Sequence, residues 1–214
     1  MRRTRTVGGL AAIVLILAGA AALMGGRLWH SQESLRSYAP ADGRPAIVCL
    51  GDSLTAGDAA PDDQAYPAWL QRRLDGAGDR YRVVNAGVSG DRVTDGLARL
   101  DRDVLSQRPA IVIVELGSND PGRTSRAVWA ADLATIVARL QARGVRVILG
   151  GLDEPGMGDI YRAVAARYGV PLVWFTAGLW SRPGLWGDTH HPNGAGYRVV
   201  ADSFWPALKA ALKR

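Results

Sequence analysis

The stretch AIVCLGDSLTAGD, residues 46–58, joins five apolar residues to a turn of small and polar ones. A short apolar run that ends in a turn is typical of a strand buried on both faces. Similar runs recur as YRVVNA at 81–86, IVIVEL at 111–116, VRVILG at 145–150 and VPLVWF at 170–175. Longer stretches with apolar residues three and four apart separate them, as in amphipathic helices. This alternation predicts an α/β domain with a five-stranded, mostly parallel sheet.

Polar residues gather where the predicted strands end. The first three runs lead into GDSLTAGD, NAGVSGD and GSNDPG, and GDTHHPNG precedes the last predicted helix. The carboxyl ends of parallel strands meet at one edge of a sheet, and ligands bind in the crevice outside that edge. We therefore expect the functional site among these four segments.

Ser53 is the candidate nucleophile at this edge, because the small residues around it allow a sharp turn that exposes its hydroxyl. A serine nucleophile needs a base, and His190 and His191 are the histidines of the domain. Asp188 stands three residues before His191, on the same side of a helical turn, where its carboxylate can orient the imidazole. Each residue also has an ordinary structural alternative. Serine and aspartate often cap helices, and a histidine in a loop can simply form structural hydrogen bonds.

Hydrolysis also needs donors for the oxyanion of the tetrahedral intermediate. Asn119, after the third strand, offers a side-chain amide, and Gly87, after the second, offers a backbone N–H that a ligand can approach closely. The Ser53 amide is a third candidate. The adjacent histidines point apart and no further ligand pair accompanies them, so we expect neither a metal nor a cofactor.

The four segments resemble the sequence blocks of the SGNH, or GDSL, serine hydrolases. GDSLTAG, NAGVSGD, GSND and DTHHP match these blocks in order. The chain is most similar to the bacterial thioesterase, arylesterase and lysophospholipase branch, which implies a flavodoxin-like three-layer α/β/α sandwich over residues 46–214. The resemblance implies catalytic or oxyanion roles for Ser53, Gly87, Asn119, Asp188 and His191.

The resemblance implies a serine ester hydrolase, and the segment after the fourth strand bears on its substrate. GGLDEPGMGDIY, residues 150–161, is short and rich in glycine and contains three acidic residues, which disfavours a deep channel for a long acyl chain. We therefore expect short to medium acyl or O-acetyl esters. Trp180, Trp186 and Arg123, in loops near the predicted site, are candidate substrate contacts. The alternatives are a lysophospholipase or acyl thioesterase for long chains, and a relative that binds carbohydrate without catalysis.

The N-terminus predicts export. Arg2, Arg3 and Arg5 precede twenty uncharged residues, 7–26, which are long enough to span a hydrocarbon core and also fit a long signal peptide. We interpret residues 1–26 as a signal peptide or membrane anchor and the polar residues 27–45 as a linker. The domain is then expected outside the cytoplasm, either membrane-anchored, periplasmic or secreted.

The charge and cysteine content exclude several classes of partner. Of 26 basic residues, three lie in the N-terminal segment, which leaves 23 against 20 acidic residues without a basic cluster. Nucleic acid is therefore not expected as a partner. Cys49 is the single cysteine of the chain, so an internal disulfide is excluded. We expect a monomer that acts on a small-molecule or glycan ester.

Overall fold

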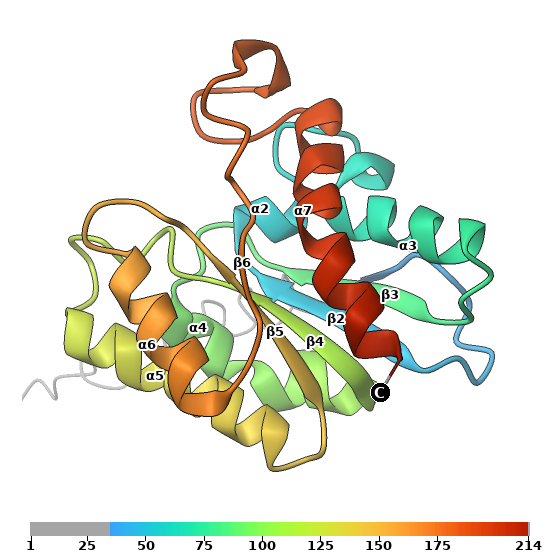
Figure 1. Cartoon of the computed structure of the whole chain (residues 1–214), viewed down its shortest axis with the longest axis horizontal. Coiled ribbons are helices and arrows are strands. Elements are labelled where there is room, and N and C mark those ends of the chain that lie inside the picture. Colours follow the sequence, from blue (N-terminus) through green and yellow to red (C-terminus); the bar gives the residue numbers. More distant parts are fainter. Residues whose placement is uncertain (1–34, 214) are drawn as a thin grey trace, which may run out of the picture. The chain divides into compact units, whose positions relative to one another are not determined.

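The computed structural model describes residues 35–213. The predicted signal peptide or membrane anchor, residues 1–26, and the first part of the predicted linker lie outside the described residues. Among the helices that are described, none is both long and apolar enough to cross a bilayer. The domain is a six-stranded sheet with helices on both faces (Figure 1).

Five parallel strands form the body of the sheet and correspond to the five apolar runs. They are β2 (Ala46–Gly51), β3 (Arg82–Gly87), β4 (Pro109–Glu115), β5 (Arg146–Gly151) and β6 (Leu172–Trp174). The spatial order is β1-β3-β2-β4-β5-β6. The predicted α/β class with a mostly parallel sheet between two helical layers is confirmed.

The sixth strand corrects the predicted count of five. β1 (Arg36–Ser37) lies in the segment interpreted as a linker and pairs antiparallel with β3, Arg36 opposite Asn85 and Ser37 opposite Val84. Two residues are too few to show an apolar periodicity, and because Arg36 is half-buried and Ser37 exposed, burial selects no apolar side chain here. The Tyr38 amide continues the pairing by donating to the Val83 carbonyl at 3.0 Å.

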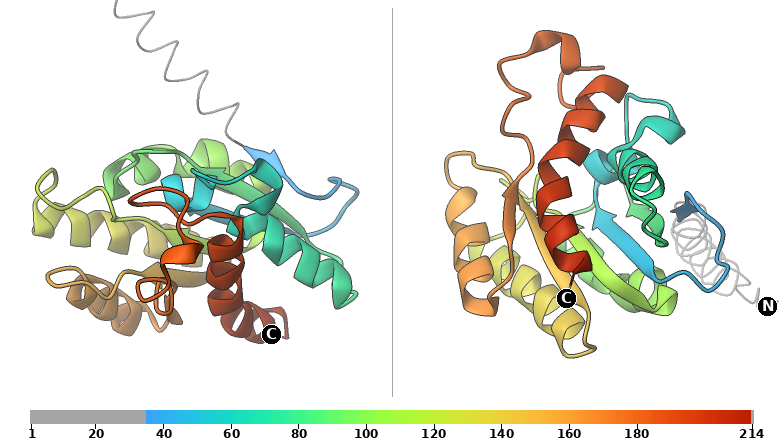
Figure 2. Two further views of the ribbon diagram at one scale, coloured as in Figure 1. Left: turned by 90° about the horizontal axis from the view of Figure 1, so that it is seen from above. Right: turned by 45° about the vertical axis from the view of Figure 1, so that its right-hand side comes forward.

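The helices divide into two layers. α3 (Tyr66–Gly76) and α7 (Gly194–Leu212) pack together on one face of the sheet, and α4 (Val93–Ala98), α5 (Arg126–Gln141) and α6 (Gly158–Tyr168) lie side by side on the other (Figures 1 and 2). Because both faces are covered, every residue of β2 is buried. This explains why its sequence is continuously apolar rather than alternating.

Aromatic side chains fill both interfaces. Beneath α3 and α7, Phe204 stacks on Tyr66 and on Phe175, with ring centroids 5.2 and 5.6 Å apart. Beneath α5 and α6, Trp129 meets Tyr161 edge to face at 5.9 Å. Burial of each large apolar side chain contributes about 1.5–3 kcal/mol, and these rings fix the helices on the strands that carry the site.

The strand order reverses at β2, which has β3 on one side and β4 on the other. In parallel sheets such a reversal opens a crevice at the carboxyl ends of the strands. α2 (Ser53–Ala56) begins there, directly after β2. Residues 35–213 also contain four short helical segments: η1 (Asp62–Gln64), η2 (Leu100–Val104, a π-helix), η3 (Leu105–Gln107) and η4 (Pro183–Leu185).

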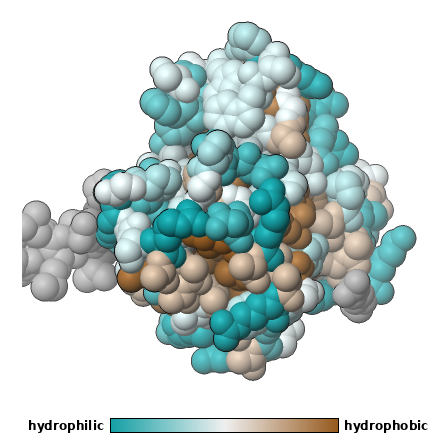
Figure 3. Space-filling model, turned by 60° about the vertical axis from the view of Figure 1, so that its left-hand side comes forward, coloured by the Kyte–Doolittle hydropathy of each residue, from teal (hydrophilic) through white to brown (hydrophobic). Residues whose placement is uncertain are grey.

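A loop between β6 and α7, residues 175–193, projects above this edge of the sheet (Figure 1). In Figure 3 the projection at the top of the molecule is pale, so its surface is intermediate in hydropathy, and browner patches lie below it. The loop contains η4 and the segment GDTHHPN, so it brings the predicted acid–base residues to the edge where β2 ends.

Candidate active site

Ser53 is positioned by the turn that joins β2 to α2. Asp52 caps this short helix, because its Oδ1 accepts the Leu54 N–H at 3.0 Å. Ser53 is the first residue of α2 and is 8% exposed. Amides in the first turn of a helix have no intrahelical acceptor, so the Ser53 N–H can serve a ligand.

The structure brings together the predicted nucleophile, base and carboxylate. His191 Nε2 lies 3.0 Å from Ser53 Oγ. On the other side of the ring, His191 Nδ1 lies 2.9 and 3.0 Å from the two carboxylate oxygens of Asp188. A bond of Nδ1–H to a carboxylate leaves Nε2 free to accept a proton from the serine hydroxyl.

The Asp188 carboxylate is held in its ionised form. Backbone N–H groups of His190 and His191 both donate to its Oδ1, at 2.7 Å. The His190 amide and, next, the His191 side chain lower the pKa of Asp188 to about 2. The exposed His190 ring has its centroid 6.4 Å from that of His191. Of the two adjacent histidines, His191 is therefore the one whose ring lies between the serine and the carboxylate.

Residues 187–191, which carry Asp188 and His191 and are called the acid–base turn below, are attached firmly to α7. The Gly187 amide donates to the His191 carbonyl at 2.9 Å, and Trp186 forms an antiparallel bridge with Pro192. Asn193 then caps α7, its Oδ1 accepting the amides of Ala195 and Gly196 at 3.1 Å. The orientation of the His191 ring is thus set by a short backbone ladder and a helix cap.

Asn119, which follows β4, lies beside the turn that carries Ser53. Its Nδ2 donates to the Asp91 carbonyl at 3.0 Å and lies 3.4 Å from Asp52 Oδ2. Ser118 Oγ donates to the same Oδ2 at 2.5 Å. The Asn119 amide is therefore held between the β3–α4 loop and the residue before Ser53. Its contact with Asp52 is long, at 3.4 Å, so this N–H can be redirected to an oxyanion while the bond to Asp91 holds the side chain in place.

Gly87 does not occupy the predicted position, and its proposed oxyanion role is corrected. It is the last residue of β3, and its N–H donates to Asn85 Oδ1 at 2.9 Å. This amide is already used within the fold. A glycine is required here for packing, because a Cβ would lie 2.2 Å from the Ala56 nitrogen of α2.

Gly90, three residues further on, is a candidate that sequence reasoning missed. It has a φ of +84°, and nothing lies within 4 Å of the place where a Cβ would be. The next residue is Asp91, whose carbonyl accepts the Asn119 amide. The turn at Gly90 thus offers an open backbone beside Asn119. The signal in the sequence was the second glycine of NAGVSGD, which lies inside the turn rather than in the strand.

Two buried carboxyl groups lie beneath the nucleophile turn. Burial raises the pKa of Asp52 to about 6, against hydrogen bonds from Ser118 and the Leu54 amide that lower it. Burial, followed by the nearby Asp52 charge, raises the pKa of Glu115 well above its ordinary value. Thr55 Oγ1 donates to Glu115 Oε2 at 2.7 Å. The apolar run that ends in Glu115 did not indicate this buried pair.

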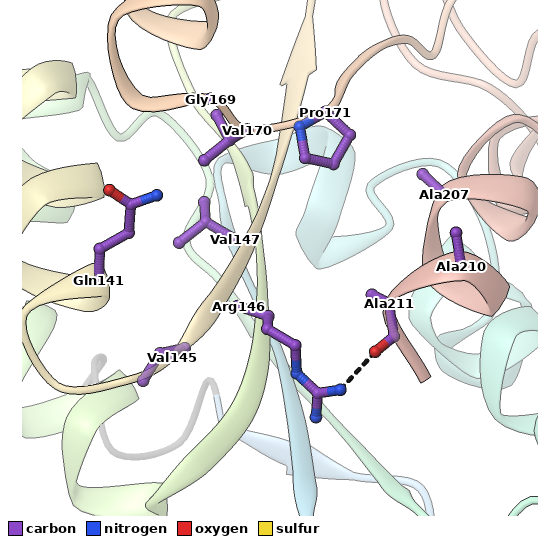
Figure 4. Close-up of a pocket in the computed structure, with 10 residues that line it drawn as sticks. All are labelled: Gln141, Val145, Arg146, Val147, Gly169, Val170, Pro171, Ala207, Ala210 and Ala211. Carbon is purple, nitrogen blue, oxygen red and sulfur yellow. Dashed lines mark hydrogen bonds between the residues drawn. The ribbon is translucent and has the colours of Figure 1, made fainter. Parts of the chain in front are cut away.

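A cavity of about 440 Å³ lies at the opposite end of the sheet. Its lining comes from the start of β5, the C-terminal ends of α5 and α7, and the residues just before β6. Val147, Pro171 and Ala207 lie on its walls (Figure 4). Arg146 at its rim donates to the Ala211 carbonyl (Figure 4). Residues 35–213 contain no group of three His, Cys, Asp or Glu side chains arranged to hold a metal ion.

Comparison with known proteins agrees with this geometry. Residues 49–199 match the profile of the GDSL-like Lipase/Acylhydrolase family. The esterase TesA of Pseudomonas aeruginosa is 35% identical over 178 residues, which cover 78% of this chain and 89% of TesA. A crystal structure of TesA superposes with a TM-score of 0.73 at 35% identity, covering 78% of this chain and 99% of that one. The chain belongs to the GDSL-like lipase/acylhydrolase family.

Family membership establishes a hydrolase that acts on ester bonds, of the esterase, thioesterase and lysophospholipase type. The thioesterase 1/protease 1/lysophospholipase L1 of Escherichia coli K12 is 31% identical over 173 residues, covering 73% of this chain and 79% of the relative. The predicted resemblance to the SGNH, or GDSL, hydrolases is thereby confirmed.

The candidate substrate contacts of this GDSL hydrolase differ in how they relate to the site. Trp180 is 58% exposed and stacks on Trp186 with ring centroids 4.8 Å apart. Trp186 Nε1 donates to the Leu179 carbonyl at 3.3 Å, which ties the pair to the loop beside the acid–base turn. Arg123 is exposed in the turn after Asn119, where its amide donates to the Asp120 carbonyl at 2.9 Å.

The segment after β5, at the same edge of the sheet, is fixed by ion pairs on both sides. Arg126 pairs with Asp159 at 2.5 Å, and Arg162 pairs with Asp153. Met157 is buried beneath this segment. Leu152 is buried as well, so the exposed surface of the segment is charged and its large apolar side chains face the interior.

Proposed function

We propose that this protein is an exported or membrane-tethered serine esterase that acts on carboxylic esters with short to medium acyl chains, including O-acetyl groups. One observation carries the proposal: His191 Nε2 lies 3.0 Å from Ser53 Oγ while its Nδ1 contacts the ionised Asp188. Nucleophile, base and orienting carboxylate are thus in hydrogen-bond contact before any substrate binds.

Acylation follows from this geometry. His191 Nε2 accepts the Ser53 proton as Oγ forms a bond to the ester carbonyl carbon, and the carbonyl π electrons move to oxygen. The resulting oxyanion is stabilised by the Ser53 N–H, the Asn119 amide and an N–H of the turn at Gly90. When the intermediate collapses, His191 returns the proton to the departing alkoxide, which leaves an acyl-serine and the free alcohol.

Deacylation repeats these steps with water. His191 removes a proton from a water molecule whose oxygen attacks the acyl carbonyl, and the same donors hold the second oxyanion. Collapse breaks the bond to Ser53 Oγ, which takes back the proton from His191, and the carboxylic acid is released. The Asp188 carboxylate stabilises the imidazolium that forms in each half-reaction and itself remains ionised.

The preference for short chains rests on the segment after β5. A long acyl chain needs an apolar wall, because each buried CH₂ contributes about 0.8 kcal/mol. The ion pairs of Asp153 and Asp159 make the exposed surface of this segment charged, so it offers no apolar wall. The exposed face of Trp180 offers a flat apolar surface for the alcohol part of the substrate, such as a sugar ring.

Export rests on the sequence alone. Three arginines followed by twenty uncharged residues have the pattern of a signal peptide or anchor that keeps its basic end in the cytoplasm. Fractionation of cells that express the full chain tests this assignment. Protein in the membrane fraction, the periplasmic fraction or the culture medium supports it, and protein in the cytoplasmic fraction contradicts it.

The substrate proposal is tested with the full chain and p-nitrophenyl esters from acetyl to palmitoyl, together with acetylated xylan. We expect kcat/KM to be highest from acetyl to hexanoyl and to fall for longer chains. Trp180→Ala should raise KM on the preferred substrate. Val128→Ala is the matched control, because Val128 is a large exposed apolar residue on α5.

Three other outcomes of these assays would contradict the proposal. Palmitoyl esters hydrolysed tenfold faster in kcat/KM, below their micellar concentration, would make the protein a long-chain lysophospholipase or thioesterase. Carbohydrate binding without turnover of any ester would identify a non-catalytic relative. Turnover that survives in Ser53→Ala would contradict the assignment of the nucleophile.

A further inference from the structure

Arg99 is a buried arginine that the proposed mechanism does not use. It follows directly after α4, and its side chain is 6% exposed. Its guanidinium donates in three directions: Nη2 to the Gly51 carbonyl at 2.8 Å, Nη1 to the Ala86 carbonyl at 2.7 Å and Nε to Asp91 Oδ2 at 2.6 Å. One rigid planar group therefore joins three separate segments of the chain.

These bonds reach the segments that carry Ser53 and the turn at Gly90, and the residue that holds the Asn119 side chain. Gly51 ends β2 and stands two residues before Ser53. Ala86 is the penultimate residue of β3, from which the chain continues to the turn at Gly90. Asp91 follows that turn, and its carbonyl accepts the Asn119 amide at 3.0 Å. Arg99 therefore contacts the strand ends that lead to Ser53 and to the turn at Gly90 directly, and reaches Asn119 through Asp91.

The surroundings of Arg99 show that it is built into the domain as a charged group. Asp91 and Asp103 both face it, at 2.6 and 3.5 Å, and the Asp103 side chain is 1% exposed. Asp103 also pairs with Arg102, at 2.7 Å, whose side chain is 37% exposed. Replacing a buried ion pair by apolar residues is often neutral for stability. The ion pairs alone therefore do not account for a guanidinium aimed at two strand ends.

We propose that Arg99 is a positioning residue for the oxyanion site. It contacts no substrate and acts through the Ser53 turn, the Gly90 turn and Asn119, so this inference rests on the proposed role of Ser53. Donors that are held in place before the reaction lower the energy of the transition state more than that of the bound substrate. Loss of Arg99 should therefore lower kcat and leave KM nearly unchanged.

The test compares Arg99→Lys and Arg99→Ala with the control Arg102→Ala in the full chain. Lysine keeps the positive charge beside Asp91 and Asp103 but lacks the planar fork that reaches all three acceptors. Steady-state kinetics on p-nitrophenyl acetate should show kcat lower by about tenfold or more in both variants, with KM within about twofold. The loss should be smaller than the roughly 10²- to 10³-fold that removal of an oxyanion donor costs, because the donors remain and are only displaced. Arg102→Ala should retain the wild-type kcat.

Two further readouts separate positioning from general damage to the fold. Phosphonylation of Ser53 by a p-nitrophenyl alkylphosphonate places an anionic oxygen at the same donors, so its rate should fall in parallel with kcat. Ethylguanidinium at millimolar concentration should partly restore kcat in Arg99→Ala and should not change that of the wild type. The far-UV circular dichroism of each variant reports whether it is folded.

A folded Arg99→Lys protein with kcat within twofold of the wild type would overturn the inference. So would a raised KM at unchanged kcat, or failure of both Arg99 variants to fold, since Arg99 would then be a structural residue. Failure of the proposed function is distinguishable, because the phosphonate would then label a residue other than Ser53 in the wild-type protein.

Discussion

At the scale of single residues, the relation between Ser53 and His191 depends on how Asp188 is held. Two backbone amides and the imidazole itself surround its carboxylate, which lowers its pKa to about 2. The charge is therefore present at all pH values where an esterase is assayed, although the side chain is half exposed. Its orientation comes from the turn and not from burial.

Asp188→Asn tests this orienting role. An asparagine can donate its amide to Nδ1 and favour the tautomer with the proton on Nε2, which cannot accept the serine proton. We expect kcat to fall by about 10³- to 10⁴-fold, with a nearly unchanged melting temperature. His190→Ala is the matched control, and its activity should stay within a few-fold of the wild type. An Asp188→Asn enzyme with near-normal kcat would contradict the role.

Most of the candidate site could be predicted from the sequence, because its residues follow strand ends in short motifs. Ser53, Asn119, Asp188 and His191 lie where the sequence placed them. Gly87 does not, since the sequence does not show at which peptide β3 ends and the turn begins. Arg99 was also missed, because a single arginine in a helical stretch resembles a surface charge until its three acceptors are known.

At the scale of elements, the contact between α2 and β3 decides the geometry of the nucleophile turn. α2 has four residues and cannot be stable alone, so its position depends on the strand beneath it. The Asn85 side chain strengthens this contact by donating to the Ala56 carbonyl at 3.3 Å. β3 thus supports both the nucleophile turn and the turn at Gly90.

Gly87→Ala should disturb this contact. The new Cβ would lie 2.2 Å from the Ala56 nitrogen and 2.6 Å from the Thr55 carbonyl carbon, so α2 must shift. We expect a loss of about 1–3 kcal/mol in the free energy of unfolding, as for overpacked cores, together with a lower kcat. Urea unfolding and ester hydrolysis measure the two effects.

Gly76→Ala provides the control for this change. Gly76 ends α3, and nothing lies within 4 Å of the place where its Cβ would be. Alanine there should leave activity unchanged and raise stability by about 0.4–1 kcal/mol, because it restricts the unfolded chain. Equal stability of the Gly87→Ala and Gly76→Ala proteins would contradict the packing argument.

The elements themselves were predictable to different degrees. Four of the five parallel strands, β2 to β5, are almost wholly buried, and each therefore has an apolar run in its sequence. The residues of β6 are half-buried and still apolar. β1 has two residues at the edge of the sheet, paired through the backbone, and no side-chain pattern marks it. Backbone pairing of this kind becomes visible only in three dimensions.

At the scale of the whole molecule, the buried carboxyl groups make stability depend on pH. Glu115 and Asp52 both have a raised pKa, chiefly through burial, so the folded state binds protons more tightly than the unfolded chain. The free energy of unfolding contributed by such groups falls as pH rises above their unfolded values of 4.5 and 3.8. Asp188 has the opposite effect. Because its pKa is lower in the folded state, its contribution to the free energy of unfolding is lost as pH falls from 3.8 toward 2.

Glu115→Gln tests how much the titration of Glu115 contributes to the pH dependence of stability. The amide removes the titration and leaves an acceptor for Thr55 Oγ1, which donates to Glu115 in the wild type. We expect the stability of the variant relative to the wild type to increase steadily as pH rises from 4.5. Urea unfolding at pH 4, 6 and 8 measures this, with Glu154→Gln as a control outside the buried pair. A constant difference across the three pH values would contradict the effect.

Covalent labelling identifies the nucleophile and so tests the proposed role of Ser53, on which the whole mechanism depends. The full chain is treated with a p-nitrophenyl alkylphosphonate, the released p-nitrophenolate is counted, and the modified peptide is mapped by mass spectrometry. We expect one equivalent of release and a single phosphonate adduct on Ser53, with no adduct in Ser53→Ala. An adduct on another residue, or undiminished ester hydrolysis by a fully treated and unlabelled protein, would contradict it.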